Sequence, residues 1–240
     1  MPAARPTLHG APHCRTLRGP LIANFGAVLG EWRTLGIGFL NTVWICALAG
    51  ALSLALAAFV STLLVSRRKL IRRAAQGAVD LLRALPFLVL LFTVYYCLRV
   101  IGVRLSAWIC GLAALVVYNT AYFAEILRGA WAHMPREQEE AGRAYGYYGL
   151  GLYGRIILPQ ILIASGPVLG NQMITLVKNS AFLMMITIPD LTSMANLVQA
   201  TYYIPFETLL VTVALYWVIC SAIEGIVRAT DRVAVVRSHE

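Results

Sequence analysis

The side chains most able to do chemistry in this chain lie in one polar stretch, residues 125–155, between two apolar segments. Carboxylates and small residues lie close together there, and nine residues separate Gly146 from the apolar group that begins at Ile156. The members of the pattern are Glu139, Glu140, Ala141, Gly142, Gly146, Ile156, Leu158 and Pro159. Carboxylates complement the positive end of a short helix, and small residues allow another backbone to approach closely. The pattern indicates docking to another protein, although its spacing alone leaves open a surface helix without a partner.

Catalysis is not indicated anywhere in the sequence. It contains no His-Glu-x-x-His, no Gly-x-Ser-x-Gly and no glycine-rich loop ending in Lys-Ser or Lys-Thr, which are patterns of zinc enzymes, hydrolases and phosphate-binding loops. It also lacks a Cys-x-x-Cys pair. We expect no catalytic residue, no metal site and no bound cofactor, so the chain should not hydrolyse ATP itself.

The elements that position the polar stretch are expected to cross a membrane. Of the 240 residues, 59% are hydrophobic and 13% are charged, whereas soluble domains carry about 25% charged residues. A spanning helix needs about 20 mostly apolar residues, and five segments meet or approach that length. We predict an all-α polytopic membrane protein with five transmembrane helices, near residues 35–65, 84–98, 105–126, 158–177 and 206–227.

The regions between and before these helices give further expectations. Residues 1–20 hold four prolines and no apolar periodicity, so we expect a disordered extension before one transmembrane domain, residues 21–240. Pro86 is expected to open the second helix. The basic segment 67–83 should lie near anionic headgroups, although a solvated linker explains it almost as well. Residues 179–203 should form a re-entrant or short helical piece.

The net charge of +9 follows the membrane topology. Basic residues are frequent in the first and third connections and in the C-terminal tail, and scarce in the second and fourth connections. This alternation places the basic-rich connections and the C-terminus in the cytoplasm and the N-terminus outside. Because the charge follows this pattern, we expect membrane lipid as a partner and no nucleic acid.

Within the polar stretch, the sequence predicts two short helices. Pro135 can stand in the first turn of the first helix, with Glu137, Glu139 and Glu140 near its positive end. Gly146 tolerates the backbone angles at which one helix ends and the next begins in a new direction. We therefore expect the break at Gly146.

The same stretch resembles the cytoplasmic signature loop of ABC-importer permeases, whose pattern is Glu-Ala-Ala, three residues, Gly, nine residues, Ile-x-Leu-Pro. All spacings match; Gly142 replaces the second Ala, at some cost in helix propensity. Residues 121–129 are similar to the segment that leads into this loop in permeases for polar amino acids. Residues 80–86, Asn171 and residues 178–180 are similar to further segments of those permeases.

The resemblance implies the membrane subunit of a type I ABC importer for a polar amino acid of the histidine, glutamine or glutamate type, in the bacterial plasma membrane. It implies two ATPase subunits that bind the ATP, a second permease subunit, and an external binding protein that delivers substrate. The helix near residues 139–148 would act as a lever whose angle Gly146 sets. Pro159 would fix the start of the fourth helix.

Two other classes of function predict features that differ from those of an importer subunit. A secondary transporter or channel without ATPases predicts inverted repeats or several charges at mid-membrane depth, and neither is visible. A membrane-embedded enzyme needs convergent nucleophiles or metal ligands, which the sequence lacks. The importer subunit remains the favoured interpretation.

Polar residues inside the apolar segments are candidates for the substrate pathway: Asn119, Asn171, Gln172 and Lys178. Amides in membrane helices often only hydrogen-bond a neighbouring helix, and this alternative stays open for each of them. Lys178 is costly to bury, which favours an acidic partner or substrate group. Its long side chain could equally extend to the membrane surface.

Overall fold

The computed structural model describes residues 21–100 and 102–237, and every regular element in these ranges is a helix. Three helices there are long and apolar enough to cross a membrane, namely α2 (Trp32–Leu64), α6 (Ala107–His133) and α12 (Pro205–Arg237). Two bent helix pairs raise the number of spans to as many as five. The predicted all-α polytopic fold is confirmed, while the expected extension, residues 1–20, lies outside the described residues.

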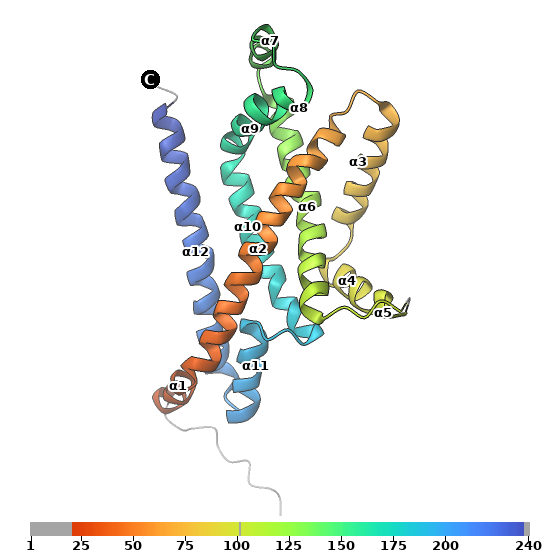
Figure 1. Cartoon of the computed structure of the whole chain (residues 1–240). Coiled ribbons are helices and arrows are strands. Elements are labelled where there is room, and N and C mark those ends of the chain that lie inside the picture. The colour runs from red at the N-terminus through yellow and green to blue at the C-terminus, as the bar shows by residue number, and fades with distance from the viewer. Residues whose placement is uncertain (1–20, 101, 238–240) are drawn as a thin grey trace, which may run out of the picture.

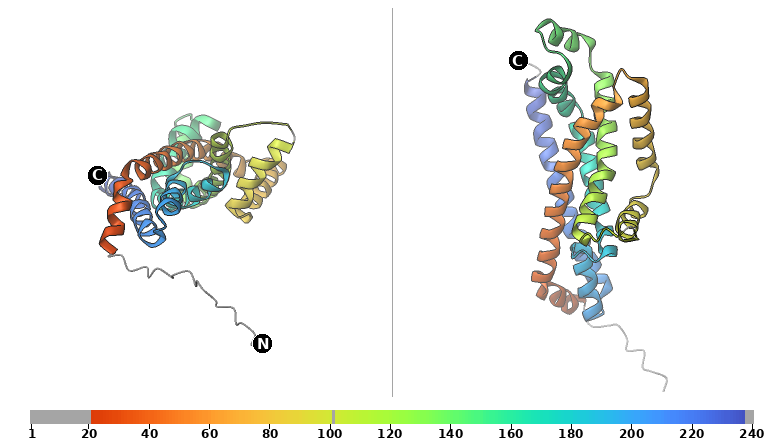
Figure 2. Two further views of the ribbon diagram at one scale, coloured as in Figure 1. Left: turned by 90° about the horizontal axis from the view of Figure 1, so that it is seen from below. Right: turned by 45° about the vertical axis from the view of Figure 1, so that its right-hand side comes forward.

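The contact between α2 and α6 forms the centre of the bundle, with the two helices side by side in Figure 1. Their facing surfaces carry buried small residues, Ala49 and Ala57 on α2 and Ala114 and Ala121 on α6. Small side chains let membrane helices approach closely enough for backbone packing to stabilise them. α12 lies on one side of this pair and α3 (Lys69–Ala84) on the other (Figures 1 and 2).

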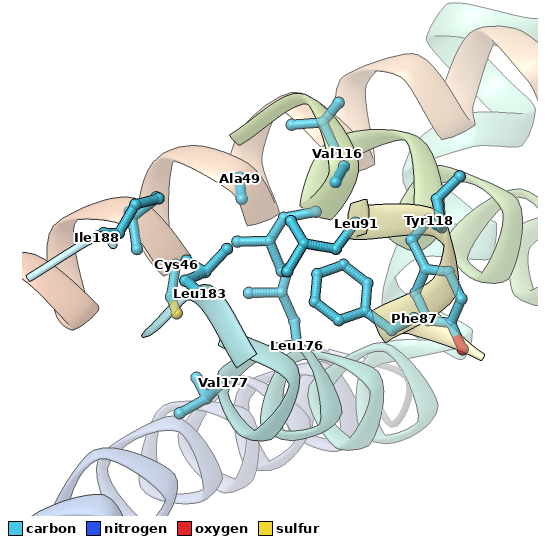
Figure 3. Close-up of a cluster of buried hydrophobic side chains, with 14 of the residues drawn as sticks. Cys46, Ala49, Phe87, Leu91, Val116, Tyr118, Leu176, Val177, Leu183 and Ile188 are labelled. Carbon is cyan, nitrogen blue, oxygen red and sulfur yellow. The ribbon is translucent and has the colours of Figure 1, made fainter. Parts of the chain in front are cut away.

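A hydrophobic cluster joins several helical elements of the bundle (Figure 3). Its buried residues come from α2, α4 (Phe87–Phe92), α6, α10 (Gly166–Ser180), the 3₁₀ turn η3 (Ala181–Ile186) and α12. The ring of Phe87 meets that of Tyr118 edge to face, with centroids 5.3 Å apart, a favoured aromatic geometry. The apolar start of α4 is therefore buried in the bundle core.

The predicted second helix differs from the structure. The basic segment 67–83 is mostly exposed, as expected, but residues 69–84 form a helix, α3, which packs beside α2 and α6. Leu85 takes extended angles (φ −84°, ψ 140°), as a residue before proline prefers, and Pro86 then opens α4 as expected. A π-helical turn, η1 (Thr93–Cys97), continues into α5 (Leu98–Val100). The helical path bends by 104° between the two arms, residues 69–84 and 87–100.

The predicted fourth helix is also bent and begins earlier than expected. Its helical path starts with α8 (Gly149–Leu152), passes through a π-helical turn, η2 (Tyr153–Ile157), and reaches α9 (Leu158–Ala164). Pro159 therefore lies within the path rather than at its start. α10 follows after a bend of 71° at Ser165. The Ser165 hydroxyl donates to the Ile161 carbonyl at 2.5 Å, a hydrogen bond that often bends helices.

The connection between α10 and α12 confirms the expected short helical piece. It comprises a 3₁₀ turn, η3 (Ala181–Ile186), and α11 (Leu191–Tyr202), whose first N–H groups are capped by the Asp190 carboxylate. α2 holds the turn between them by two hydrogen bonds. The Asn41 amide donates to the Pro189 carbonyl at 2.9 Å, and the Leu191 N–H donates to the Thr42 hydroxyl at 3.0 Å. α1 (Leu21–Gly30) precedes α2 at this same end (Figure 1).

Gly38 makes this approach of α2 to the turn possible, which gives a test of the packing. A Cβ atom at Gly38 would lie 2.9 Å from both the Asp190 carbonyl oxygen and the Leu191 Cα, and backbone atoms cannot rotate away. We predict that Gly38→Ala destabilises the protein by about 1–3 kcal/mol, as overpacking does, in thermal unfolding in detergent. Gly36→Ala is the matched control, because its Cβ meets nothing within 4 Å. Equal unfolding temperatures for the two variants would contradict this contact.

Candidate functional site

The polar stretch places a short helix at one end of the molecule. α6 continues to His133, beyond its expected end near residue 126, and α7 (Arg136–Ala144) then lies past the ends of its neighbours (Figure 1). Pro135 stands directly before α7, and Glu137 and Glu139 lie in its first turn, at the positive end of the helix. Glu139 forms an ion pair with Arg143 one turn later. The predicted first helix is confirmed.

Gly146 ends α7 in the way that the sequence predicts. Its φ angle is +84°, a left-handed conformation that glycine adopts without strain. The Gly146 N–H donates to the Arg143 carbonyl at 3.0 Å and the Tyr147 N–H to the Gly142 carbonyl at 3.1 Å. This pair of bonds is the Schellman motif that satisfies the last carbonyls of a helix. Gly149 also has a positive φ, +55°, which sequence reasoning missed.

Gly142 has a packing role that its helix propensity did not reveal. It is buried, and a Cβ atom there would lie 2.6 Å from Leu152 Cδ1 and 2.7 Å from Ile156 Cδ1. The missing side chain lets α7 lie directly against η2. Gly142 and Ile156 therefore hold α7 in place and do not form its free face. Leu158 is half-buried and Pro159 is exposed at the start of α9.

The free face of this region combines the predicted residues Glu140 and Ala141 with three residues that the sequence analysis missed. We call these five residues the α7 surface: Glu140, Ala141, Tyr145, Tyr148 and Leu150, all exposed. Tyr145 is 85% exposed and Leu150 is 78% exposed. Tyrosine is enriched among the few residues that contribute most of the binding energy at protein interfaces. The concentration of tyrosines after Gly142 was the available signal.

Tyr153 joins the polar stretch to the bundle. Its hydroxyl donates to the Ala58 carbonyl at 2.7 Å and lies 2.8 Å from the Ser61 hydroxyl, both on α2. Its ring stacks on Trp131 near the end of α6, with centroids 5.1 Å apart. The sequence analysis did not single out Tyr153. The structure makes it a link between the region that carries α7 and two of the long helices.

Two segments that carry the resemblance meet at the base of this region. The Arg128 guanidinium donates to both carboxylate oxygens of Glu125, at 2.6 and 2.8 Å, and an Arg83 nitrogen lies 3.9 Å from the same carboxylate. The Tyr122 hydroxyl donates to the Arg83 carbonyl at 3.2 Å. These contacts fix the end of α3 to α6.

Two of the four candidate pathway residues bind each other. The Gln172 amide on α10 donates to the Asn119 side-chain oxygen on α6 at 3.0 Å, and the Asn119 amide donates to the Leu115 carbonyl at 2.8 Å. Both side chains are buried. The arrangement matches the alternative of a hydrogen bond between neighbouring helices.

The other two candidates lie on a different face of α10. Asn171 and Lys178 are both exposed in this chain, and Thr175 lies between them, one turn from each. Their spacing of four and three residues places them on one side of a helix. The structure thus separates the predicted set into a buried pair and an exposed polar face.

Several long apolar helices, an exposed polar helix at one end and an exposed polar face on α10 are features of a membrane-spanning transport subunit. Residues 49–234 match the family described as "Binding-protein-dependent transport system inner membrane component". The chain belongs to this family.

Individual relatives agree with this assignment. The "Probable glutamine ABC transporter permease protein GlnM" of Bacillus subtilis (strain 168) is 31% identical over 182 residues, 76% of this chain and 84% of its own length. The "Histidine/lysine/arginine/ornithine transport system permease protein HisM" of Escherichia coli (strain K12) is 29% identical over 205 residues, 81% of this chain and 86% of its own. A solved structure described as an amino acid ABC transporter with histidines has a TM-score of 0.78 at 27% identity and covers 87% of this chain and 97% of that chain.

Proposed function

We propose that this chain is the permease subunit of an ATP-driven importer that moves a polar amino acid across the bacterial plasma membrane. Its substrate arrives on an external binding protein, two separate ATPase subunits bind the ATP, and a second permease subunit, identical or similar, completes the pathway. The similarity to relatives named for glutamine and for histidine, lysine, arginine and ornithine supports the substrate class. The observation that supports the proposal most strongly is the α7 surface, a group of exposed residues on and after a polar helix that lies outside the apolar bundle.

In this proposal the α7 surface docks on an ATPase subunit. When the ATPases close, α7 moves as a unit because Gly142 packs it against η2. Tyr153 then passes the movement to α2 through Ala58 and to α6 through Trp131. The spans would alternate between inward and outward access, a switch between two states that ATP and substrate bind differently.

The orientation follows from the distribution of charge. α7, the corner between α2 and α3 and the C-terminal end of α12 lie at one end of the bundle in Figure 1. This end carries the basic-rich connections, so we assign it to the cytoplasm. α11 lies at the opposite end, where the external binding protein would deliver the substrate.

The pathway in this proposal runs along the exposed polar face of α10. Asn171, Thr175 and Lys178 would be unfavourable against lipid, so we assign this face to a water-filled passage next to the second permease subunit. Lys178 would bind the substrate carboxylate, since an ammonium and a carboxylate form a charge-assisted hydrogen bond. Gln172 and Asn119 would instead hold the wall of the passage together.

A glycine substitution separates coupling from folding. Gly146→Val places a β-branched residue at φ +84°, which costs about 1–3 kcal/mol locally. The chain should still reach the membrane, but ATP hydrolysis by the assembled complex should no longer respond to the loaded binding protein. Gly154→Val is the control, because Gly154 lies in η2 and its Cβ meets nothing within 4 Å. Substrate-stimulated hydrolysis at the parent level in Gly146→Val would refute the role of this region in coupling.

A substitution on the exposed face of α10 should change transport, whereas one in the buried Asn119–Gln172 pair should change stability. Lys178→Met should reduce uptake of labelled amino acid by roughly 10- to 150-fold, the factor equivalent to the loss of about 1.5–3 kcal/mol from one charged hydrogen bond, without changing thermal unfolding. Gln172→Leu should lower the stability by about 1–3 kcal/mol, because the Asn119 amide oxygen loses its donor. Lys178→Arg keeps the charge and serves as the control. Uptake unchanged by Lys178→Met would show that this side chain extends to the membrane surface instead.

A further inference from the structure

The corner between α2 and α3 carries a cluster of cations that coupling does not use. Five of its seven residues are basic: Arg67, Arg68, Lys69, Arg72 and Arg73. None of the five forms an ion pair within the part of the chain that the structure describes. Between them lie Leu70, which is 83% exposed, and Ile71, which is 36% exposed. A cytoplasmic connection of a membrane protein is expected to be rich in Lys and Arg. That expectation does not explain why Leu70 and Ile71 are exposed among them.

A hollow of about 420 Å³ opens between this corner and the end of α6. Its polar wall is made by Arg72, Gln76 and Arg128, and its apolar wall by Leu64, Val65 and Trp131. Arg128 is already bound to Glu125 through two hydrogen bonds. Arg72 is half-buried and makes no ion pair with any described residue. The hollow therefore offers one uncompensated guanidinium beside an apolar surface.

We propose that this hollow binds the headgroup of an anionic phospholipid of the cytoplasmic leaflet, with its phosphate on Arg72. A guanidinium binds phosphate oxygens through two parallel hydrogen bonds. Leu64 is the last residue of a 33-residue apolar helix and Val65 follows it directly, so we place the hollow at the level of the lipid headgroups. Leu70 and Ile71 would then contact the acyl chains. This placement rests on the orientation assigned in the proposed function.

A lipid suits the site better than an acidic protein surface. An acidic partner would pair with the cations but would leave Leu70 exposed to water, whereas the membrane boundary accommodates cations and apolar side chains together. Trp131 lines this hollow and also a second one, which contains Arg67 and Glu139. A bound headgroup would therefore brace the stack of Trp131 on Tyr153, at the base of the region that carries α7.

The site can be tested in the assembled transporter, with its ATPase and permease partners, in nanodiscs of equal phosphatidylglycerol and phosphatidylcholine. Lipids that remain bound after detergent extraction are counted by native mass spectrometry. The parent should retain phosphatidylglycerol in preference to phosphatidylcholine. Arg72→Gln should reduce that retention about fivefold, the factor equivalent to about 1 kcal/mol for one basic residue at an anionic surface.

Arg73→Gln is the matched control, since it removes the same charge from a neighbour that does not line the hollow. It should change retention by less than about twofold, as expected of a solvent-screened charge. Arg72→Lys should keep most of the retention and shows whether loss in Arg72→Gln reflects charge or folding. Equal losses in Arg72→Gln and Arg73→Gln would mean diffuse attraction and would overturn the site. Equal retention of both lipids by the parent would overturn it too.

Two further measurements distinguish a failure of the lipid site from a failure of the assigned membrane orientation. If Arg72→Gln released the ATPase subunit but kept phosphatidylglycerol, the corner would be a protein contact and the lipid site would be wrong. An impermeant maleimide applied to intact cells should label an Arg73→Cys variant no more than the parent, whose Cys97 is exposed, so that position 73 itself stays unlabelled. Labelling from outside would refute the assigned orientation, and with it the cytoplasmic leaflet, whereas protection combined with lost lipid preference would refute only the lipid site.

Discussion

Tyr153 attaches the polar stretch that carries α7 to the two long central helices, α2 and α6. Its hydroxyl binds the backbone of α2 at Ala58 and the hydroxyl of Ser61, and its ring stacks on Trp131 of α6. A polar helix outside a membrane bundle has little apolar surface of its own to bury. It needs a fixed attachment to take a defined position, and Tyr153 supplies that attachment.

Small residues allow close packing on both sides of Tyr153, toward α7 and toward the α2–α6 pair. Gly142 lets α7 lie on Leu152 and Ile156, in the helical turns that contain Tyr153. Buried alanines let α2 and α6 lie side by side behind it. Because closely packed elements switch between discrete arrangements rather than deform gradually, a displacement of α7 in the proposed importer would reach both helices. Polar contacts such as that of Gln172 with Asn119 then join α10 to the same unit.

The fold was largely predictable because hydropathy and local backbone chemistry act over short distances. Apolar length predicted the spans, and the requirement for a positive φ predicted the break at Gly146. The helix α3 was missed because only Val79 on it is buried, so its composition resembles that of a solvated linker. Pro86 was placed correctly, but the 104° bend around it depends on tertiary packing.

The site was predictable in position but not in detail. Glu140 and Ala141 are exposed as expected, whereas Gly142 and Ile156 serve packing between segments brought together only by the fold. The role of Tyr153 depends on partners more than 90 residues away along the chain, which no local pattern reports. For the same reason, spacing could not separate the Asn119–Gln172 pair from the exposed face of α10.

Photochemical cross-linking in the complete transporter can show whether the α7 surface contacts an ATPase subunit. Benzoylphenylalanine placed at position 141, in place of the exposed Ala141, should form an adduct with the ATPase subunit on irradiation. The same probe in place of Asn196, exposed on α11 at the opposite end of the bundle, should form none. An adduct from position 141 with the external binding protein, or an ATPase adduct from position 196 alone, would contradict the account.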